Sequence, residues 1–286
     1  MTTRYGFRRV GDVDVFYREA GPSDAPVILL LHGFAASSYM FRELIPVLAQ
    51  KYHVLAPDLP GFGQTDVMPG VEFSYTFNNL ASIIDAFTVA KGVDRYAIYV
   101  FDYGAPVGWR LAVKNPQKIS AIVSQNANAY EEGLSEGWAD MRKAWNDPTP
   151  ENREALRRFN TPEMIKWQYT EGVEDTSVIA PEGYQLASAA IERIGAEAQM
   201  DLLLDYGDNI KQYEQLHEFF RQYQPPTLAI WGKNDPFFMP VGAEAFKRDN
   251  PKAEVRLLNT GHLALETHGK EIATAMLDFL NRSIKP

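Results

Sequence analysis

The sequence contains no cysteine among its 286 residues. Disulfides and thiolate metal sites require cysteine, so the chain has neither a cross-linked framework nor a cysteine-ligated metal. Positive charge is also scarce, because 28 Lys and Arg are outnumbered by 37 Asp and Glu, which gives a formal net charge of −9. An acidic surface repels nucleic-acid phosphates, and we therefore expect no nucleic-acid partner.

Long hydrophobic runs are absent as well. The longest aliphatic run, VILLL, has five residues, whereas a helix that spans a bilayer needs about 20. The opening residues, MTTRYGFRRV, lack the apolar stretch of a secretion signal. We therefore expect a cytoplasmic protein without a membrane partner. The five histidines show no metal-ligand spacing, so we expect no metal and no cofactor, and the oligomeric state is left open.

Short apolar runs alternate with helical patterns over most of the chain. This alternation predicts a mostly parallel, doubly wound α/β sheet. The expected strands are residues 12–21, 26–33, 53–58, 95–101, 119–125, 226–232 and 253–258. The clearest helical patterns are residues 39–50, 77–93 and 271–284, the second of which has Gly92 at its expected C-terminal end.

The alternation stops between residues 127 and 223. This stretch is rich in Trp and Tyr, has helical patterns and lacks a convincing strand. It predicts a helical cap inserted late in the sheet, with residues 1–126 and 224–286 as the core domain. Because ligands bind outside the carboxyl ends of parallel strands, we expect the cap to cover a site there. A second domain with no role in chemistry is the alternative.

A strand-to-helix corner at residues 100–104, Val-Phe-Asp-Tyr-Gly, matches the nucleophile elbow G-x-S-x-G with Asp102 in the serine position. Such a corner exposes the central side chain to the site, and the next backbone N–H can stabilise an anion there. An aspartate that only caps the following helix is the alternative. Val100 stands where a small residue normally relieves crowding, and the sequence does not explain it.

Three further elements follow strands in the order that this architecture requires. Asp235 follows strand 226–232 and His262 follows strand 253–258, which gives nucleophile, acid and histidine in sequence. Phe34 follows strand 26–33, so its backbone N–H and that of Tyr103 are the expected oxyanion donors. The sequence therefore predicts a catalytic triad of Asp102, Asp235 and His262.

The segments HGF, DLPGFGQTD, FDYGAPVG, GKNDPFF and TGHLALE resemble the α/β-hydrolase superfamily, and they extend over nearly the whole chain. An aspartate at the elbow resembles the epoxide hydrolases and the haloalkane and fluoroacetate dehalogenases, which share a helical cap and a carboxylate nucleophile. Attack by a carboxylate on an ester would give a reactive anhydride, whereas attack on a saturated carbon gives a stable ester. Water activated by His262, which Asp235 orients, would then hydrolyse that ester. The expected substrates are water and a small apolar or aromatic molecule.

The leaving group separates the candidate activities. Epoxide hydrolases protonate it with cap tyrosines, and the resemblance implies Tyr206 in the Tyr-x-x-Asn segment and Tyr169 as its partner, with Tyr184 and Tyr213 open. Haloalkane dehalogenases bind halide with side-chain N–H groups at the positions of Phe34 and Tyr103, where this chain has none, although a tryptophan of the cap could supply one. Ala35 replaces the usual proline of the epoxide hydrolases. We expect an epoxide hydrolase; a dehalogenase and a non-catalytic ligand receptor are the alternatives.

Overall fold

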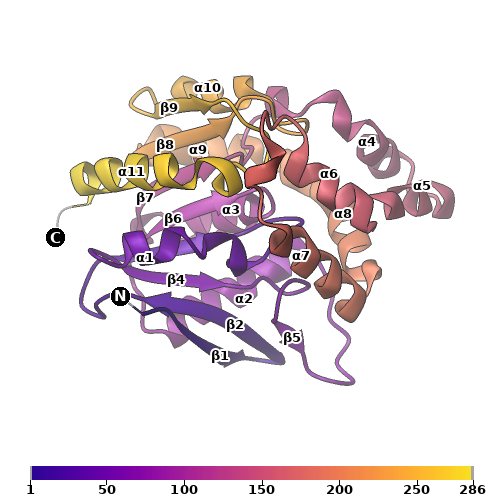
Figure 1. The fold of residues 1–286 in the computed structure, drawn as a ribbon, viewed down its shortest axis with the longest axis horizontal. Coiled ribbons are helices and arrows are strands. Elements are labelled where there is room, and N and C mark those ends of the chain that lie inside the picture. Colours follow the sequence, from indigo (N-terminus) through magenta and orange to yellow (C-terminus); the bar gives the residue numbers. More distant parts are fainter. Residues whose placement is uncertain (1, 285–286) are drawn as a thin grey trace.

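One nine-stranded sheet forms the centre of the molecule in the computed structural model, which describes residues 2–284. Its strand order is β1-β2-β4-β3-β6-β7-β8-β9, with β5 paired to β2 (Figure 1). The strands are β1 Arg4–Val10, β2 Val13–Ala20, β3 Val27–Leu31, β4 His53–Pro57, β5 Asp66–Val67, β6 Tyr96–Phe101, β7 Ile119–Gln125, β8 Thr227–Gly232 and β9 Glu254–Leu258. All pairs from β4 through β3 to β9 are parallel, and the pairs of β2 are antiparallel.

Helices cover both faces of this sheet. The helices are α1 Leu44–Leu48, α2 Phe77–Ala90, α3 Gly104–Lys114, α4 Ala139–Asn146, α5 Pro150–Ala155, α6 Pro162–Thr170, α7 Pro181–Ile194, α8 Ala196–Lys211, α9 Tyr213–Tyr223, α10 Pro240–Asp249 and α11 Leu265–Ser283. The pair α1 and α11 lies on one face, whereas α2, α3, α9 and α10 lie on the other (Figure 1). The central strands β6, β7 and β8 are therefore buried along their whole length.

The predicted fold class is confirmed. Each of the seven expected strands is present, and residues 39–50 form a 3₁₀ turn, Ser38–Phe41, followed by α1. Gly92 has a positive φ of 69° just after α2, as a glycine that ends a helix requires. The sequence reading missed β1, which forms a hairpin with β2, and the two-residue β5. The sequence does not predict β1, because its residues are mostly exposed and show no clear alternation of apolar and polar side chains.

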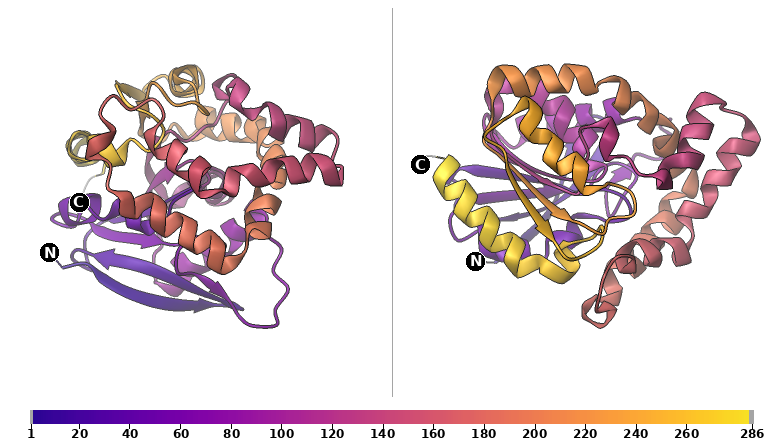
Figure 2. Two further views of the ribbon diagram at one scale, coloured as in Figure 1. Left: turned by 45° about the vertical axis from the view of Figure 1, so that its right-hand side comes forward. Right: turned by 90° about the horizontal axis from the view of Figure 1, so that it is seen from above.

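A helical segment (residues 126–226) connects β7 to β8 and contains α4 to α9. Within it the structure has no strand, only an isolated bridge between Leu134 and Phe238. Figure 2 shows α4 to α8 gathered at one end of the sheet, whereas α9 packs against α3 and α10. A separate cap domain with the bounds 127–223 stays a prediction. No helix in residues 2–284 is both long enough and apolar enough to span a membrane.

Candidate active site

The candidate residues follow the four strands β3, β6, β8 and β9, which are consecutive in the sheet except that β7 lies between β6 and β8. These strands are parallel, so their carboxyl ends meet at one edge. Phe34 follows β3, Asp102 follows β6, Asp235 follows β8 and His262 follows β9. The structure therefore brings together the side chains of the three triad candidates and the backbone of Phe34.

The corner at Asp102 has the backbone of a nucleophile elbow. Asp102 has a φ of 46°, a region that non-glycine residues rarely adopt. A side chain at Gly104 would collide with the backbone carbonyl of Leu31 on the adjacent strand, so the turn requires a glycine there. The sharp turn from β6 into α3 thus depends on Gly104 and presents the Asp102 carboxylate to the site.

Val100 is accommodated by a glycine one turn into α3. A Cβ atom at Gly108 would collide with Cγ1 of Val100, so the missing side chain at 108 provides the room that the valine occupies. Val100 itself is fully buried. The small residue that the elbow needs is therefore on the helix side of the contact, which explains the departure at position 100.

Backbone N–H groups surround the Asp102 carboxylate. The N–H of Phe34 donates to Asp102 Oδ1 at 2.6 Å, and the N–H of Tyr103 also hydrogen bonds to this carboxylate. A Cβ atom at Gly33 would lie 2.5 Å from Asp102 Oδ1 and from the Tyr103 nitrogen, so the close approach requires glycine. Both predicted oxyanion donors thus lie beside the same carboxylate.

His32 fixes the loop that carries Phe34. Its Nε2 accepts the N–H of Leu59 at 2.9 Å, which leaves the hydrogen on Nδ1, 3.1 Å from the carbonyl oxygen of Gly33. Burial lowers the pKa of His32, so the ring stays neutral and keeps this tautomer. The peptide bond between Phe34 and Ala35 is cis.

His262 lies between the two candidate carboxylates. Its Nδ1 donates to Asp235 Oδ2 at 2.7 Å, and its Nε2 lies 3.7 Å from Asp102 Oδ2. The other oxygen of Asp235 accepts the backbone N–H groups of Phe237 and Phe238 at 2.7 and 3.1 Å. The imidazole is thus oriented with Nε2 toward Asp102, and Nε2 has no hydrogen-bond partner among the described residues.

Burial acts in opposite directions on the pKa values of Asp102 and His262. Burial raises the pKa of Asp102 to about 6, although the charge of His262 and the N–H groups of Phe34 and Tyr103 act in the opposite direction. Burial alone would lower the pKa of His262, but the charge and hydrogen bond of Asp235 and the charge of Asp102 raise it above its ordinary value. At neutral pH Asp102 is therefore mostly ionised, as a carboxylate nucleophile must be.

Asn126 is a candidate site residue that the sequence patterns did not predict. Its Nδ2 donates to Asp235 Oδ2 at 2.7 Å, and its Oδ1 accepts the N–H of Gly232 at 2.9 Å. It adopts a positive φ of 44° directly after β7. Its position at a strand end between those of Asp102 and Asp235 was the signal available in the sequence. Asn126 holds the Asp235 carboxylate in the orientation that meets His262.

Comparisons with known proteins agree with this arrangement. The family model of the alpha/beta hydrolase fold matches residues 26–269. The chain belongs to this family. An uncharacterized hydrolase of Saccharomyces cerevisiae is 42% identical over 271 residues, which cover 93% of this chain and 92% of the relative. A haloalkane dehalogenase of Psychrobacter cryohalolentis is 33% identical over 284 residues, covering 94% of this chain and 88% of the relative.

A solved structure of an epoxide hydrolase from Vigna radiata has a TM-score of 0.75 and covers 98% of both chains. Its sequence identity is 22%, so the likeness is one of fold. The predicted resemblance to the α/β-hydrolase superfamily, in the branch of epoxide hydrolases and dehalogenases, is confirmed. The protein is a hydrolase of this fold.

Tyr206 of the hydrolase lies on α8 above the elbow. It is fully buried, and its ring centroid is 5.8 Å from that of Tyr103. Burial, together with the nearby Tyr213 and the charge of Asp102, raises the pKa of Tyr206 well above its ordinary value. The phenol is therefore protonated at neutral pH, and Asp102 is close enough for its charge to affect the pKa of Tyr206.

Tyr169 lies on α6 and has a different partner. Its hydroxyl donates to the carbonyl oxygen of Ala35 at 3.0 Å, and burial raises its pKa. Tyr184 packs edge-on against the Tyr169 ring, with centroids 5.8 Å apart. Tyr213 accepts a hydrogen bond from Asn128 at 3.2 Å. The charge of Asp102 helps to raise the pKa of Tyr206 but is not among the causes that raise the pKa of Tyr169 or Tyr213.

Two indole rings lie near Tyr206, and the N–H groups of both are occupied. The Trp138 ring lies 4.4 Å from Tyr206 and donates to the carbonyl of Phe237 at 3.1 Å. The Trp145 ring lies 6.1 Å from Tyr206 and donates to the carbonyl of Leu203 at 2.8 Å. Neither indole N–H is directed at a leaving group beside Asp102. Within residues 2–284, no cluster of three or more His, Asp or Glu side chains could hold a metal ion.

Proposed function

We propose that the hydrolase opens epoxides to vicinal diols through a covalent ester on Asp102. The observation that carries this proposal is the protonated phenol of Tyr206 above the elbow, where the nearby indole N–H groups are bonded to backbone carbonyls. An epoxide oxygen leaves as an alkoxide and needs a proton, which a phenol supplies. A halide ion needs N–H donors instead, and the side chains of Phe34 and Tyr103 provide none.

In the first proposed step, Asp102 Oδ2 attacks one carbon of the epoxide ring. The ester C–O bond forms as the ring C–O bond breaks, and the ring oxygen takes the phenol proton of Tyr206. Asp102 loses its negative charge in this step. Since that charge is one cause of the raised pKa of His262, esterification lowers the pKa of the imidazole and favours the neutral base.

In the second step, His262 Nε2 removes a proton from water, and the hydroxide attacks the ester carbonyl of Asp102. The resulting oxyanion is stabilised by the N–H groups of Phe34 and Tyr103. The bond between the ester carbonyl carbon and the substrate oxygen then breaks. The remaining hydrogen of the attacking water passes to that oxygen, so the diol leaves and the Asp102 carboxylate is restored. The proton on His262 returns through solvent to the Tyr206 phenolate, so the sum of both steps is epoxide plus water giving diol.

Dehalogenation by the same ester is the second candidate, supported by the relationship to the haloalkane dehalogenase of Psychrobacter cryohalolentis. The test measures diol release from aryl and alkyl epoxides and halide release from bromoalkanes and fluoroacetate. We expect diol formation and little halide release. Halide release that exceeds diol formation would replace the proposal by the dehalogenase, and a melting shift with these compounds without turnover would favour a ligand receptor.

The role of His262 can be tested by trapping. In His262→Gln the base is gone, so we expect the ester on Asp102 to accumulate during reaction with an epoxide. Intact-protein mass spectrometry should show the mass of the epoxide added, located on the peptide that contains Asp102. Substrate consumption by this variant without an adduct would contradict the assignment.

A further inference from the structure

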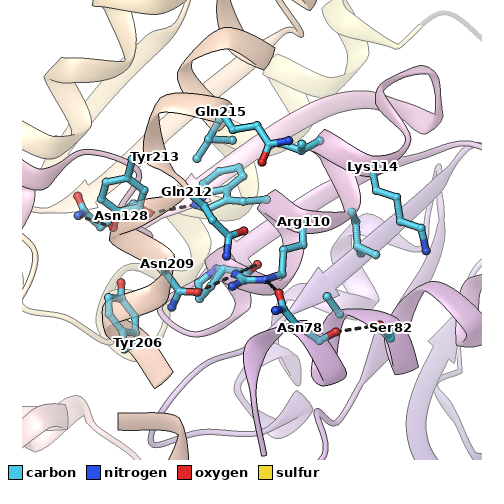
Figure 3. A pocket seen from close by; sticks show the side chains of 16 residues that line it. Asn78, Ser82, Arg110, Lys114, Asn128, Tyr206, Asn209, Gln212, Tyr213 and Gln215 are labelled. Atoms are coloured by element: carbon cyan, nitrogen blue, oxygen red, sulfur yellow. Dashed lines mark hydrogen bonds between the residues drawn. The ribbon is translucent and has the colours of Figure 1, made fainter. Parts of the chain in front are cut away.

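A cavity lies behind Tyr206, between α2, α3, α8 and α9. Its volume is about 410 Å³. Tyr206 and Tyr213 are the candidate tyrosines in its wall, whereas Asp102, Asp235, His262 and Tyr169 do not line it. Figure 3 shows the side chains of Arg110, Asn78 and Asn209 meeting in this cavity. The cavity is thus distinct from the carboxylate and imidazole of the candidate active site.

Arg110 is the charged group of this cavity. Its Nε donates to Asn78 Oδ1 at 2.6 Å, and its Nη1 donates to Asn209 Oδ1 at 2.7 Å and to the carbonyl of Pro106 at 3.0 Å. Its Nη2 is buried and has no hydrogen-bond partner within residues 2–284. Arg110 forms no ion pair in that range. Burial lowers the pKa of Arg110, and the charges of the more distant Asp205 and Asp208 act in the opposite direction.

Asn209 adds a second donor beside Arg110. It is 4% exposed, and its Nδ2 likewise has no partner among the described residues. Because its Oδ1 is bonded to Arg110, its amide N–H₂ lies close to the guanidinium. Arg110 is only partly buried, but its Nη2 is enclosed, and this Nη2 and the enclosed Nδ2 of Asn209, both with unused hydrogens, match the two oxygens of one carboxylate.

The remaining wall agrees with a negatively charged ligand that has an apolar part. Among the described residues that line the cavity there are two cations and no Asp or Glu. Lys114 pairs with Asp85 at 2.7 Å, so Arg110 is the cation that a ligand would meet. The two acidic groups whose charges act on Arg110 have closer partners: Asp205 accepts the N–H of Phe77, and Asp208 pairs with Lys211. Apolar side chains complete the wall: Ala81, Pro106, Trp109, Leu111, Val113 and Leu216.

We propose that this cavity binds a small aliphatic carboxylate, with its two oxygens on Arg110 and Asn209 and its chain against Trp109 and Leu216. Such a ligand binds outside the reaction centre. It contacts the face of α8 that carries Tyr206, three residues before Asn209. Binding itself does not depend on the proposed reaction.

The test is a ligand-observed NMR titration with hexanoate and with its neutral counterpart hexanamide. We expect saturable binding of hexanoate and clearly weaker binding of hexanamide, because the charge is recognised. Arg110→Gln should weaken hexanoate binding about tenfold or more, since the charge-assisted hydrogen bond to one carboxylate oxygen is lost. The matched control, Arg4→Gln on the exposed part of β1, removes the same charge far from the cavity and should bind as the parent protein does.

Ser82→Trp provides a second variant that keeps Arg110. Ser82 lines the cavity from the exposed side of α2, so an indole there fills the cavity without disturbing the core. We expect it to abolish hexanoate binding while the melting temperature stays near that of the parent. Equal affinity for hexanamide, unchanged binding in either cavity variant, or displacement of hexanoate by an epoxide substrate would each overturn the proposal. The titration measures no turnover, so its failure is separate from failure of the epoxide hydrolase assignment.

Discussion

The edge of the sheet and the helical segment hold their candidate residues by different means. At the sheet edge, hydrogen bonds fix both carboxylates: Asp235 accepts from Asn126, Phe237, Phe238 and His262, and Asp102 accepts from two backbone N–H groups. In the helical segment, Tyr206 is held mainly by aromatic packing against Phe77, Tyr103, Trp138 and Trp145.

This difference assigns the two regions different tasks. Hydrogen bonds at strand ends define directions, which a nucleophile, a base and an oxyanion site require. Ring packing defines the position of the Tyr206 ring, and Tyr213 is a side-chain partner of its hydroxyl that helps to raise the pKa of Tyr206. We therefore expect the sheet edge to determine whether the ester chemistry occurs at all, and the helical segment to determine which leaving groups are accepted.

The largest expected effect comes from the sheet edge. Asp102→Ala removes the nucleophile, and we expect kcat for diol formation to fall by about 10⁴-fold or more. Asp102→Asn keeps the size and should lose activity as strongly when measured directly after purification. Circular dichroism should show both variants folded. A folded Asp102→Ala with more than a tenth of the parent activity would rule out the covalent mechanism.

The next effect separates the two tyrosines of the helical segment. Tyr206→Phe removes the proton donor, so we expect epoxide opening to slow by about 10²–10³-fold, within the range of general acid catalysis. Tyr169→Phe removes only the hydrogen bond to Ala35, worth about 1 kcal/mol, so kcat should change less than tenfold. Any halide release from bromoalkanes should be nearly unchanged in both. If Tyr169→Phe is the more damaging substitution, the two roles must be exchanged.

The sequence predicts the residues at the sheet edge better than it predicts the contacts that helices make with the sheet. Strand ends are predictable, because apolar runs locate parallel strands and their carboxyl ends converge at one edge, which placed Phe34, Asp102, Asp235 and His262 together. The compensation between Val100 and Gly108 was not predictable, since it is a contact between a strand and the helix behind it. Neither was the contact of Tyr169 with Ala35, because helical spacing does not show where a helix is placed over the sheet.

A smaller effect concerns the pH dependence of ester formation. The pKa of Asp102 is raised to about 6, and only the ionised carboxylate attacks. We therefore expect the single-turnover rate of ester formation to be constant above about pH 7 and to fall about tenfold per unit well below pH 6. A rate that stays constant down to pH 4.5 would contradict the burial of Asp102 seen here.

His262→Gln sharpens this measurement. The charge of His262 lowers the pKa of Asp102, so its removal should raise that pKa and move the acid limb to higher pH. Ester formation remains measurable in this variant because only the second step needs the base. If the acid limb of the pH–rate profile moves to lower pH or stays in place, the imidazole of His262 carries little charge before the ester forms.

The smallest expected effect concerns the corner that supports Asp102 from behind. Alanine normally stabilises a helix interior relative to glycine by about 1 kcal/mol, but in Gly108→Ala the new methyl collides with Val100. We therefore expect Gly108→Ala to destabilise the protein by about 1–3 kcal/mol in urea unfolding. In a Val100→Ala background the collision is gone, and the same substitution should become neutral or stabilising. Equal effects of Gly108→Ala in both backgrounds would show no coupling between the two positions. A change of sign would show that the valine at this elbow depends on a glycine eight residues later.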